Sequence, residues 1–168
     1  CSAMSTHYLG DHFDIHCGGV DNIFPHHENE IAQSCCALGS KFVNYWIHNE
    51  HLSVEGEKMS KSSGNFYTIR DLFEKGYSPE SIRYALLSSH YRQKLNFTFE
   101  RLDSAQKAIN KLQELSRRLK LISDDNKGSS DYANKTNEFV SDFNKQLADD
   151  LNISGSLGSL FIWVNFLF

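Results

Sequence analysis

The sequence is poor in several features that would each indicate a particular class of protein. Its 17 Lys and Arg stand against 21 Asp and Glu, a formal net charge of -4, so no overall positive field indicates a nucleic-acid partner. Its four cysteines have no regular spacing, and a disulfide between the adjacent Cys35 and Cys36 would be strained. A secreted disulfide framework is therefore not expected, and a reducing compartment fits better. A nucleic-acid partner is not excluded, because basic side chains can be confined to one face of a protein.

Targeting and membrane segments are also missing from the sequence. The first residues lack the basic region and apolar run of a signal peptide. The mostly apolar stretch at residues 157–168 is far shorter than the about 20 residues that span a bilayer. We therefore expect a cytoplasmic protein with no membrane partner. Because the chain opens on Cys1 and ends within that apolar stretch, we expect both ends to be edges of a fragment.

What is present indicates a packed α/β part at the beginning of the chain. Hydrophobic residues make up 40% and charged residues 23% of the sequence, values near those of globular proteins. Pro25 and Gly39 bound a predicted helix at about residues 26–38. Apolar and β-branched residues predict a short strand before this helix and extended stretches after it, at residues 13–15, 42–48 and 51–54. The strand, helix, strand order predicts a parallel sheet.

Beyond about residue 65 the pattern predicts helices only. Thr68 with Asp71, and Ser78 before Pro79, are typical helix starts. From Arg101 to Leu119 apolar residues recur at steps of three and four, which predicts one long helix. A polar linker at residues 123–131 and two more helices, at about residues 132–148 and from residue 153, complete the prediction.

Three short strings carry residues suited to chemistry. The first string places two ammonium groups and small hydroxyl residues in one loop, Lys58-Met59-Ser60-Lys61-Ser62 followed by Ser63-Gly64-Asn65. Such a loop can bind phosphates, or it can be a solvated basic turn. In Phe24-Pro25-His26-His27-Glu28-Asn29-Glu30, His26 and Glu30 share a helix face. With a thiolate from Cys1 they would supply three zinc ligands, although such a pair alone is more often a cap or a surface pair. His16-Cys17-Gly18-Gly19-Val20-Asp21 suits close approach of a nucleotide, but a Gly-Gly turn after a strand is common.

Together these strings resemble the cysteinyl-tRNA synthetases. Residues 58–62 match the KMSKS motif of class I aminoacyl-tRNA synthetases, and residues 1–4, 16–21, 24–30 and 44–46 follow the order and spacing of the cysteine enzymes. The resemblance covers most of residues 1–120, weakens along the long helix and returns faintly at residues 149–152. Two departures are Cys17 and Ser63, where the family usually has glycine and leucine.

The resemblance implies an α/β fold, the second half of a Rossmann-type parallel-sheet catalytic domain followed by an all-helical bundle domain. Residues 1–66 would form the catalytic part with the KMSKS loop, and residues 67–100 a helical connecting region that contacts the tRNA stem. Residues 101–168 would form a truncated helical domain that binds the tRNA anticodon. The N-terminal half, with the HIGH motif for ATP, would be missing from this chain.

The resemblance also implies the roles of individual residues. One zinc ion would be bound by Cys1, His26 and Glu30, with a cysteine of the missing half as fourth ligand. From their position elsewhere on the helix, and independently of the resemblance, His27 and Glu28 are expected to orient ligands or bind nucleotide. Lys58 and Lys61 would be the catalytic residues that act on the phosphates, with Lys61 the better candidate for the transition state. ATP, supplied with Mg²⁺, and the adenylate would be bound by His16, Gly18, Gly19, Asp21, Lys58, Met59, Ser60, Lys61 and Ser62.

The implied activity is that of a cysteine–tRNA ligase, with tRNA(Cys), ATP and L-cysteine as partners and zinc selecting the thiolate. We expect a monomer, and no catalysis by this fragment alone. Two other functions stay open. One is a cysteine ligase of mycothiol biosynthesis, in which the acceptor is an amino-sugar. The other is a non-catalytic nucleotide- or zinc-binding module.

Overall fold

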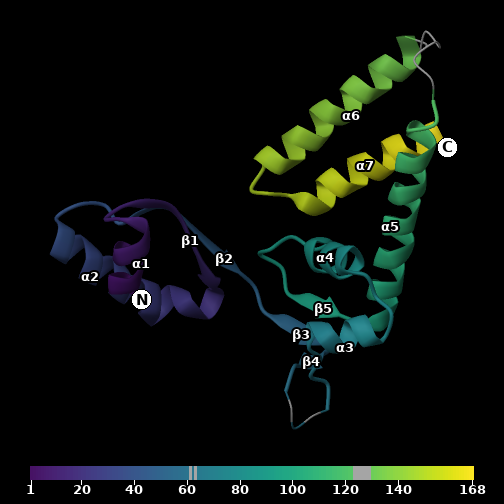
Figure 1. Ribbon diagram of the computed structural model, residues 1–168. Helices are drawn as coiled ribbons and strands as arrows, with labels where there is room; N and C mark the ends of the chain where they lie inside the picture. The colour runs from purple at the N-terminus through teal and green to yellow at the C-terminus, as the bar shows by residue number, and fades with distance from the viewer. Residues whose placement is uncertain (61, 63, 123–129) are drawn as a thin grey trace. The chain divides into compact units, whose positions relative to one another are not determined.

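The computed structural model describes residues 1–60, 62, 64–122 and 130–168 (Figure 1). These residues form two compact units. The first contains Cys1–His51 and Tyr91–Lys94, and the second contains Leu52–His90 and Leu95–Phe168. The second unit begins at Leu52, and the implied end of the catalytic part at residue 66 stays a prediction.

The first unit is built on a βαβ arrangement. After helix α1 (Ser2–Leu9), strand β1 (Phe13–Gly19) leads through a short 3-10 turn and a π-helical turn into helix α2 (Glu28–Leu38), and strand β2 (Val43–Asn49) follows. The two strands pair in parallel, with His16 beside Trp46 and Gly18 beside His48. The predicted parallel pairing is therefore confirmed.

The start of α2 differs from the prediction. Regular α-helix begins at Glu28, two residues after the expected start, because Phe24 is extended at φ -133° and ψ 133°. A residue that precedes proline is disfavoured in the helical region, so the chain winds first through the turn Ile23–His27. Helix α1, which the sequence analysis did not predict, lies against α2, since Ser2 Oγ donates a hydrogen bond of 3.1 Å to Gln33.

A small mixed sheet and three helices make the core of the second unit. Strand β3 (Leu52–Val54) pairs antiparallel with β4 (Glu57–Lys58) and in parallel with β5 (Leu95–Phe97). Against this sheet pack α3 (Ile69–Glu74), α4 (Pro79–Leu87) and α5 (Phe99–Leu119). The buried apolar cluster comprises Val54, Leu72, Ile82, Ala85, Phe97, Leu102 and Ala105.

Strand β5 contradicts the expectation that the chain is wholly helical after residue 65. It is only three residues long, and its apolar Leu95 and Phe97 are buried while Asn96 is exposed. So short an alternation gives almost no periodic signal, and the strand is defined by its pairing with β3, more than 40 positions earlier.

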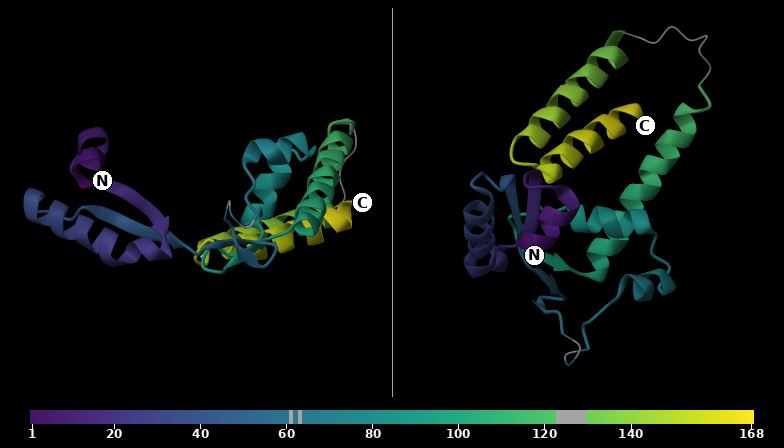
Figure 2. Two further views of the ribbon diagram at one scale, coloured as in Figure 1. Left: turned by 90° about the horizontal axis from the view of Figure 1, so that it is seen from below. Right: turned by 60° about the vertical axis from the view of Figure 1, so that its left-hand side comes forward.

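The helix starts in the second unit follow the predicted caps. Thr68 and Asp71 form a reciprocal capping box at α3, and these hydrogen bonds lower the pKa of Asp71. Ser78 accepts a hydrogen bond from Ser81 at the start of α4. The long predicted helix is α5, and the last two are α6 (Ser130–Ala148) and α7 (Ile153–Leu167), which lie side by side in every view (Figures 1 and 2).

The predicted linker at residues 123–131 is described only in part. Its residues 123–129 lie outside the described residues, and the last two belong to α6. Among the helices that are described, none combines the length and apolarity required to cross a bilayer.

Candidate functional site

A buried carboxylate lies at the centre of the first unit's polar cluster. Glu30, in the first turn of α2, is only 2% exposed. One of its oxygens, Oε2, is 2.8 Å from Nε2 of His16 on β1. The other oxygen, Oε1, is buried and has no hydrogen-bond partner among the residues that the structure describes. An ionised carboxylate with one unpaired oxygen is costly to bury, so Oε1 is suited to a ligand that carries positive charge.

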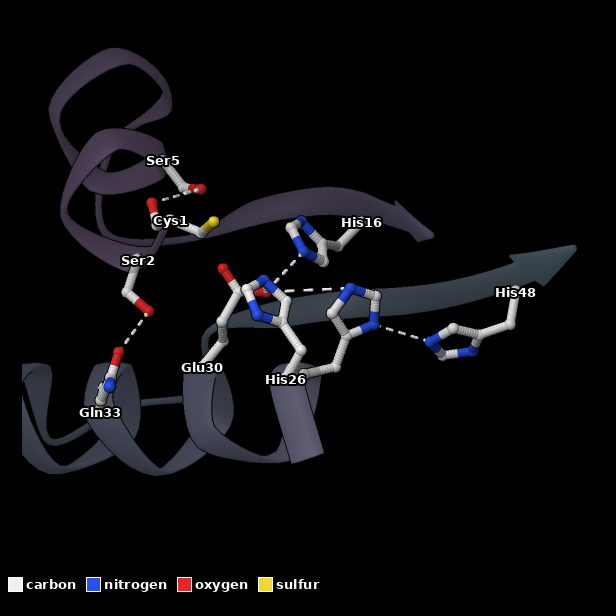
Figure 3. Close-up of polar contacts among 9 residues, drawn as sticks. Cys1, Ser2, Ser5, His16, His26, Glu30, Gln33 and His48 are labelled. Atoms are coloured by element: carbon white, nitrogen blue, oxygen red, sulfur yellow. Dashed lines mark hydrogen bonds and ion pairs between the residues drawn. The ribbon is translucent and has the colours of Figure 1, made fainter. Parts of the chain in front are cut away.

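Side chains of three different segments lie close together around the Glu30 carboxylate. The ligand atoms of Cys1, His26 and Glu30 all lie within 4.8 Å of one another, and Figure 3 shows them turned toward a common space. Nε2 of His26 is 3.8 Å from Oε2 of Glu30, as their spacing of four along the chain predicts. Cys1 caps the N-terminus of α1, and the Ser2–Gln33 hydrogen bond ties that helix to α2.

This donor set fits zinc. Sulfur, imidazole nitrogen and carboxylate oxygen are the three ligand types that Zn²⁺ uses in proteins. Ligand atoms of a tetrahedral zinc ion lie about 3.3–3.8 Å apart, as follows from their bond lengths of about 2.0–2.3 Å. The separations of up to 4.8 Å are somewhat longer, so small side-chain movements suffice to close the set. The unpaired Oε1 of Glu30 supports the same conclusion.

A second group of possible ligands shares Glu30. The ligand atoms of His16, His27 and Glu30 also lie within 4.8 Å of one another. This group is mostly buried, whereas Cys1 and His26 are exposed. A metal ion that binds a substrate needs an open coordination position, so the exposed group is better suited to that role. His16 is then better suited to orient the candidate ligand Glu30, whose carboxylate lies 2.8 Å from its ring nitrogen.

His27 lies in a layer of aromatic rings next to Glu30. Its ring is 4.9 Å from that of Trp46 and 4.8 Å from that of His16, between ring centroids. Its Nδ1 is 2.7 Å from Nε2 of His48, so one ring must donate and the other accept. Burial, reinforced by the neighbouring His16 and His48, lowers the pKa of His27 below its ordinary value of 6.5. The lowered pKa favours the neutral form of the His27 ring.

Gly18 has a packing role in this layer. A Cβ atom at Gly18 would lie 2.6 Å from Cε1 of His27 and 3.1 Å from the Asn22 side chain. The absence of a side chain therefore lets the His27 ring approach β1. At Gly19 the nearest atom to a Cβ would be Oδ1 of Asp21, at the end of an exposed side chain.

The predicted nucleotide residues of the first unit lie at the end of β1. Gly18 and Gly19 end the strand, and Asp21 follows in the 3-10 turn Val20–Asn22 with its side chain exposed. Cys17, one of the departures from the family pattern, is exposed on β1. Carboxyl ends of parallel strands are where nucleotides bind in doubly wound folds, which is consistent with the predicted role of these residues.

The predicted phosphate loop belongs to the second unit. Lys58 ends β4 and is exposed, while Met59 packs against the buried apolar cluster. Oγ of Ser60 is 3.1 Å from Oγ of Ser62. Lys61 lies outside the described residues, so its role in phosphate binding stays a prediction.

The structure thus brings together the three predicted metal ligands and adds partners that the sequence analysis missed. The role of His16 in lining the adenylate pocket stays a prediction, and the structure adds a contact of 2.8 Å between its ring nitrogen and Glu30. His48 had no predicted role and is the partner of His27. The excess of histidine, eight in 168 residues, was the available signal. It could not identify the pairs, because these depend on the register between β1 and β2.

Comparison with solved structures defines the class of fold. The chain is similar to the leucyl-tRNA synthetase of the ternary complex from Agrobacterium radiobacter K84, with a TM-score of 0.72 over 92% of this chain and 22% of that one, at 16% identity. It is also similar to methionyl-tRNA synthetase of Mycobacterium tuberculosis in complex with methionyl-adenylate, with a TM-score of 0.64 over 95% of this chain and 33% of that one, also at 16% identity. The fold is the Rossmann-like α/β fold of class I synthetase catalytic domains.

Sequence comparison identifies the family. The model of the class I (C) tRNA synthetase catalytic domain matches residues 1–107, and the chain belongs to this family. The chain is 56% identical over 166 residues to a cysteine–tRNA ligase of Brachyspira hyodysenteriae, covering 98% of the chain and 35% of that protein. It is 49% identical over 165 residues to that of Protochlamydia amoebophila, covering 98% and 34%. The chain therefore spans about a third of the length of these relatives.

The contact between Gly18 and His27 can be tested by stability. We expect Gly18→Ala to lower the free energy of unfolding by about 1–3 kcal/mol, because the buried His27 ring, fixed by His48, must move. Gly19→Ala is the matched control, since the exposed Asp21 side chain can rotate away, and we expect about 0.5 kcal/mol or less. Denaturant unfolding of both variants measures the difference, and equal costs would contradict the packing role of Gly18.

Proposed function

We propose that this chain acts, as part of a longer protein, in the ATP-dependent activation of L-cysteine and its transfer to tRNA(Cys). The observation that carries the proposal is the convergence of Cys1, His26 and Glu30 with an unpaired buried oxygen, in a chain 56% identical to a cysteine–tRNA ligase. A thiol substrate needs a soft, thiophilic site, and this donor set fits one. We expect the fragment alone to be inactive.

The reaction that we propose has two steps. A carboxylate oxygen of cysteine attacks the α-phosphorus of ATP, the bond to the β-phosphate bridging oxygen breaks, and pyrophosphate leaves. The 2′-hydroxyl of the terminal adenosine of tRNA then attacks the acyl carbon of cysteinyl-adenylate, and AMP leaves. Both steps depend chiefly on the placement of reactants and on stabilisation of phosphate charge, so no side-chain nucleophile is required.

The residues of the first unit would bind and select the amino acid. Cys1, His26 and Glu30 would hold a zinc ion, and His16 would fix the orientation of the Glu30 carboxylate. When bound, zinc supplies a Lewis acid that prefers thiolate to the hydroxyl of serine. An apolar pocket alone discriminates such near-isosteres by only about 10².

The remaining predicted residues would bind the nucleotide. Asp21, exposed after β1, is suited to accept hydrogen bonds from ribose hydroxyls, and Gly18 and Gly19 leave little bulk at that edge. Lys58 and Lys61 would donate charge-assisted hydrogen bonds to the phosphates, and Lys61 would stabilise charge on the leaving pyrophosphate. Mg²⁺ would accompany ATP.

Variants of the ligand set test the zinc proposal in the complete protein. We expect His26→Ala and Glu30→Ala to lose zinc and cysteine-dependent ATP–pyrophosphate exchange. We expect His16→Ala to retain the ligands but to bind zinc about 10–100-fold more weakly, because Glu30 is no longer held. Metal analysis and competition with a chelator measure affinity independently of activity.

A surface histidine provides the control for these variants. His12 is exposed and bonds only to the backbone oxygen of Lys41 among the described residues, so His12→Ala should retain both zinc and activity. Unchanged adenylate formation by a zinc-free His26→Ala protein would contradict the proposal.

The role of Lys61 can be separated from substrate binding. We expect Lys61→Ala to slow adenylate formation by about 10²–10³-fold while cysteine affinity changes little, because the lost charge acts on the leaving group. Single-turnover kinetics and equilibrium binding measure the two quantities. Lys107→Ala, an exposed lysine on α5, is the control. Equal losses in rate and affinity would exclude a transition-state role.

Two assays distinguish the other candidate functions. Transfer of cysteine to an amino-sugar in place of tRNA would indicate the ligase of mycothiol biosynthesis. Absence of cysteine-dependent pyrophosphate exchange by the complete, zinc-loaded protein would indicate a non-catalytic module. Charging of tRNA(Cys) supports the proposed ligase over both.

A further inference from the structure

Asn65, which follows the KMSKS string, makes three hydrogen bonds from one side chain. Its Oδ1 accepts a hydrogen bond of 2.9 Å from the backbone N–H of Ser60. Its Nδ2 donates to two backbone carbonyl oxygens, that of Lys58 at 3.2 Å and that of Val54 at 3.5 Å. A single planar carboxamide therefore contacts the backbone at three points, one of them in the buried core strand β3.

The position of these bonds explains why a side chain is needed there. The pairing of β3 with β4 consists of Ser53 with Lys58 and Val54 with Glu57, and β4 ends at Lys58. Among the described residues, no strand pairs with the chain that leaves β4, so its polar backbone groups need other partners. Asn65 is half-buried and supplies both a donor and an acceptor at this point.

The three contacts link the loop to the apolar core. Val54 is 2% exposed and belongs to the buried cluster of the second unit, against which Met59 also packs. Through Asn65, the backbone at Lys58 and Ser60 is connected to this fixed strand. Because the exposed Lys58 side chain extends from this backbone, the position of the backbone determines where the side chain can reach.

We propose that Asn65 is a positioning residue that holds Lys58 and the start of the loop in the geometry used for phosphate binding. The inference rests on the proposed function and deepens it. Asparagine suits the role because aspartate cannot donate to the two carbonyls, and alanine offers neither donor nor acceptor. Misplacement of a charged group by about 1 Å can reduce a rate by about 10²-fold, so the effect should be kinetic as well as structural.

The experiment uses three variants of the complete protein: Asn65→Ala, Asn65→Asp and the control Asn96→Ala. Asn96 stabilises the same hairpin, because its Oδ1 accepts hydrogen bonds of 2.8 Å from the Gly56 N–H and 3.2 Å from Ser53 Oγ. No hydrogen bond joins its side chain to the residues between 58 and 65 that the structure describes. The Asn96→Ala substitution therefore removes comparable hydrogen bonds at the other end of the hairpin. Amide hydrogen exchange of the peptide over residues 58–65 is measured beside pyrophosphate-exchange kinetics.

We expect Asn65→Ala to speed amide exchange at Ser60 and to lower kcat/KM for ATP by about 10²-fold, with KM for cysteine unchanged. Asn65→Asp keeps the acceptor for Ser60, so it should protect that amide while activity stays low. Asn96→Ala should leave both readouts within about threefold of wild type.

Two results would overturn the inference. One is unchanged exchange at Ser60 in Asn65→Ala, which requires no catalytic activity to observe. The other is a failure of the kinetic comparison, in which a folded Asn65→Ala protein loses no more activity than Asn96→Ala. Lack of pyrophosphate exchange by the wild-type protein contradicts the proposed function instead, and the hydrogen-exchange comparison still tests the contact.

Discussion

The buried carboxylate of Glu30 is the constraint on which the first unit depends. One oxygen is bonded to His16 at 2.8 Å, and the other is buried without a partner among the described residues. The effective penalty for burying a charge is several kcal/mol unless it is compensated. The β1–β2 register places His16, the turn before α2 presents His26, and Cys1, at the start of α1, lies within reach of the same carboxylate. Each element of the unit thus contributes to one small electrostatic arrangement.

The two units offer different kinds of chemistry. The first offers sulfur, imidazole and carboxylate groups supported by a layer of aromatic rings, in which Gly18 makes room for His27. The second offers the exposed Lys58, whose backbone is connected to a buried strand through Asn65. In our proposal, the first arrangement selects the amino acid and the second stabilises phosphate charge. Soft-ligand selection and cationic catalysis would have different chemical requirements.

Local signals in the sequence predicted local structure well. The cap at Thr68, the long apolar repeat of α5 and the shared face of His26 and Glu30 depend on residues three or four apart, and the structure has all of them. Strand β5 and the His27–His48 pair depend on contacts between distant segments, for which no local pattern exists. The approach of Cys1 to Glu30 was expected from family resemblance, because spacing alone could not bring them together.

X-ray absorption at the zinc edge of the complete protein tests the central claim most directly. We predict a zinc site with sulfur and lighter nitrogen or oxygen ligands, at about 2.3 Å and 2.0–2.1 Å. Addition of L-cysteine should add one zinc–sulfur bond, whereas addition of L-serine should leave the sulfur count unchanged. A bound zinc ion without sulfur ligands, or with a sulfur count that cysteine does not alter, would contradict the account.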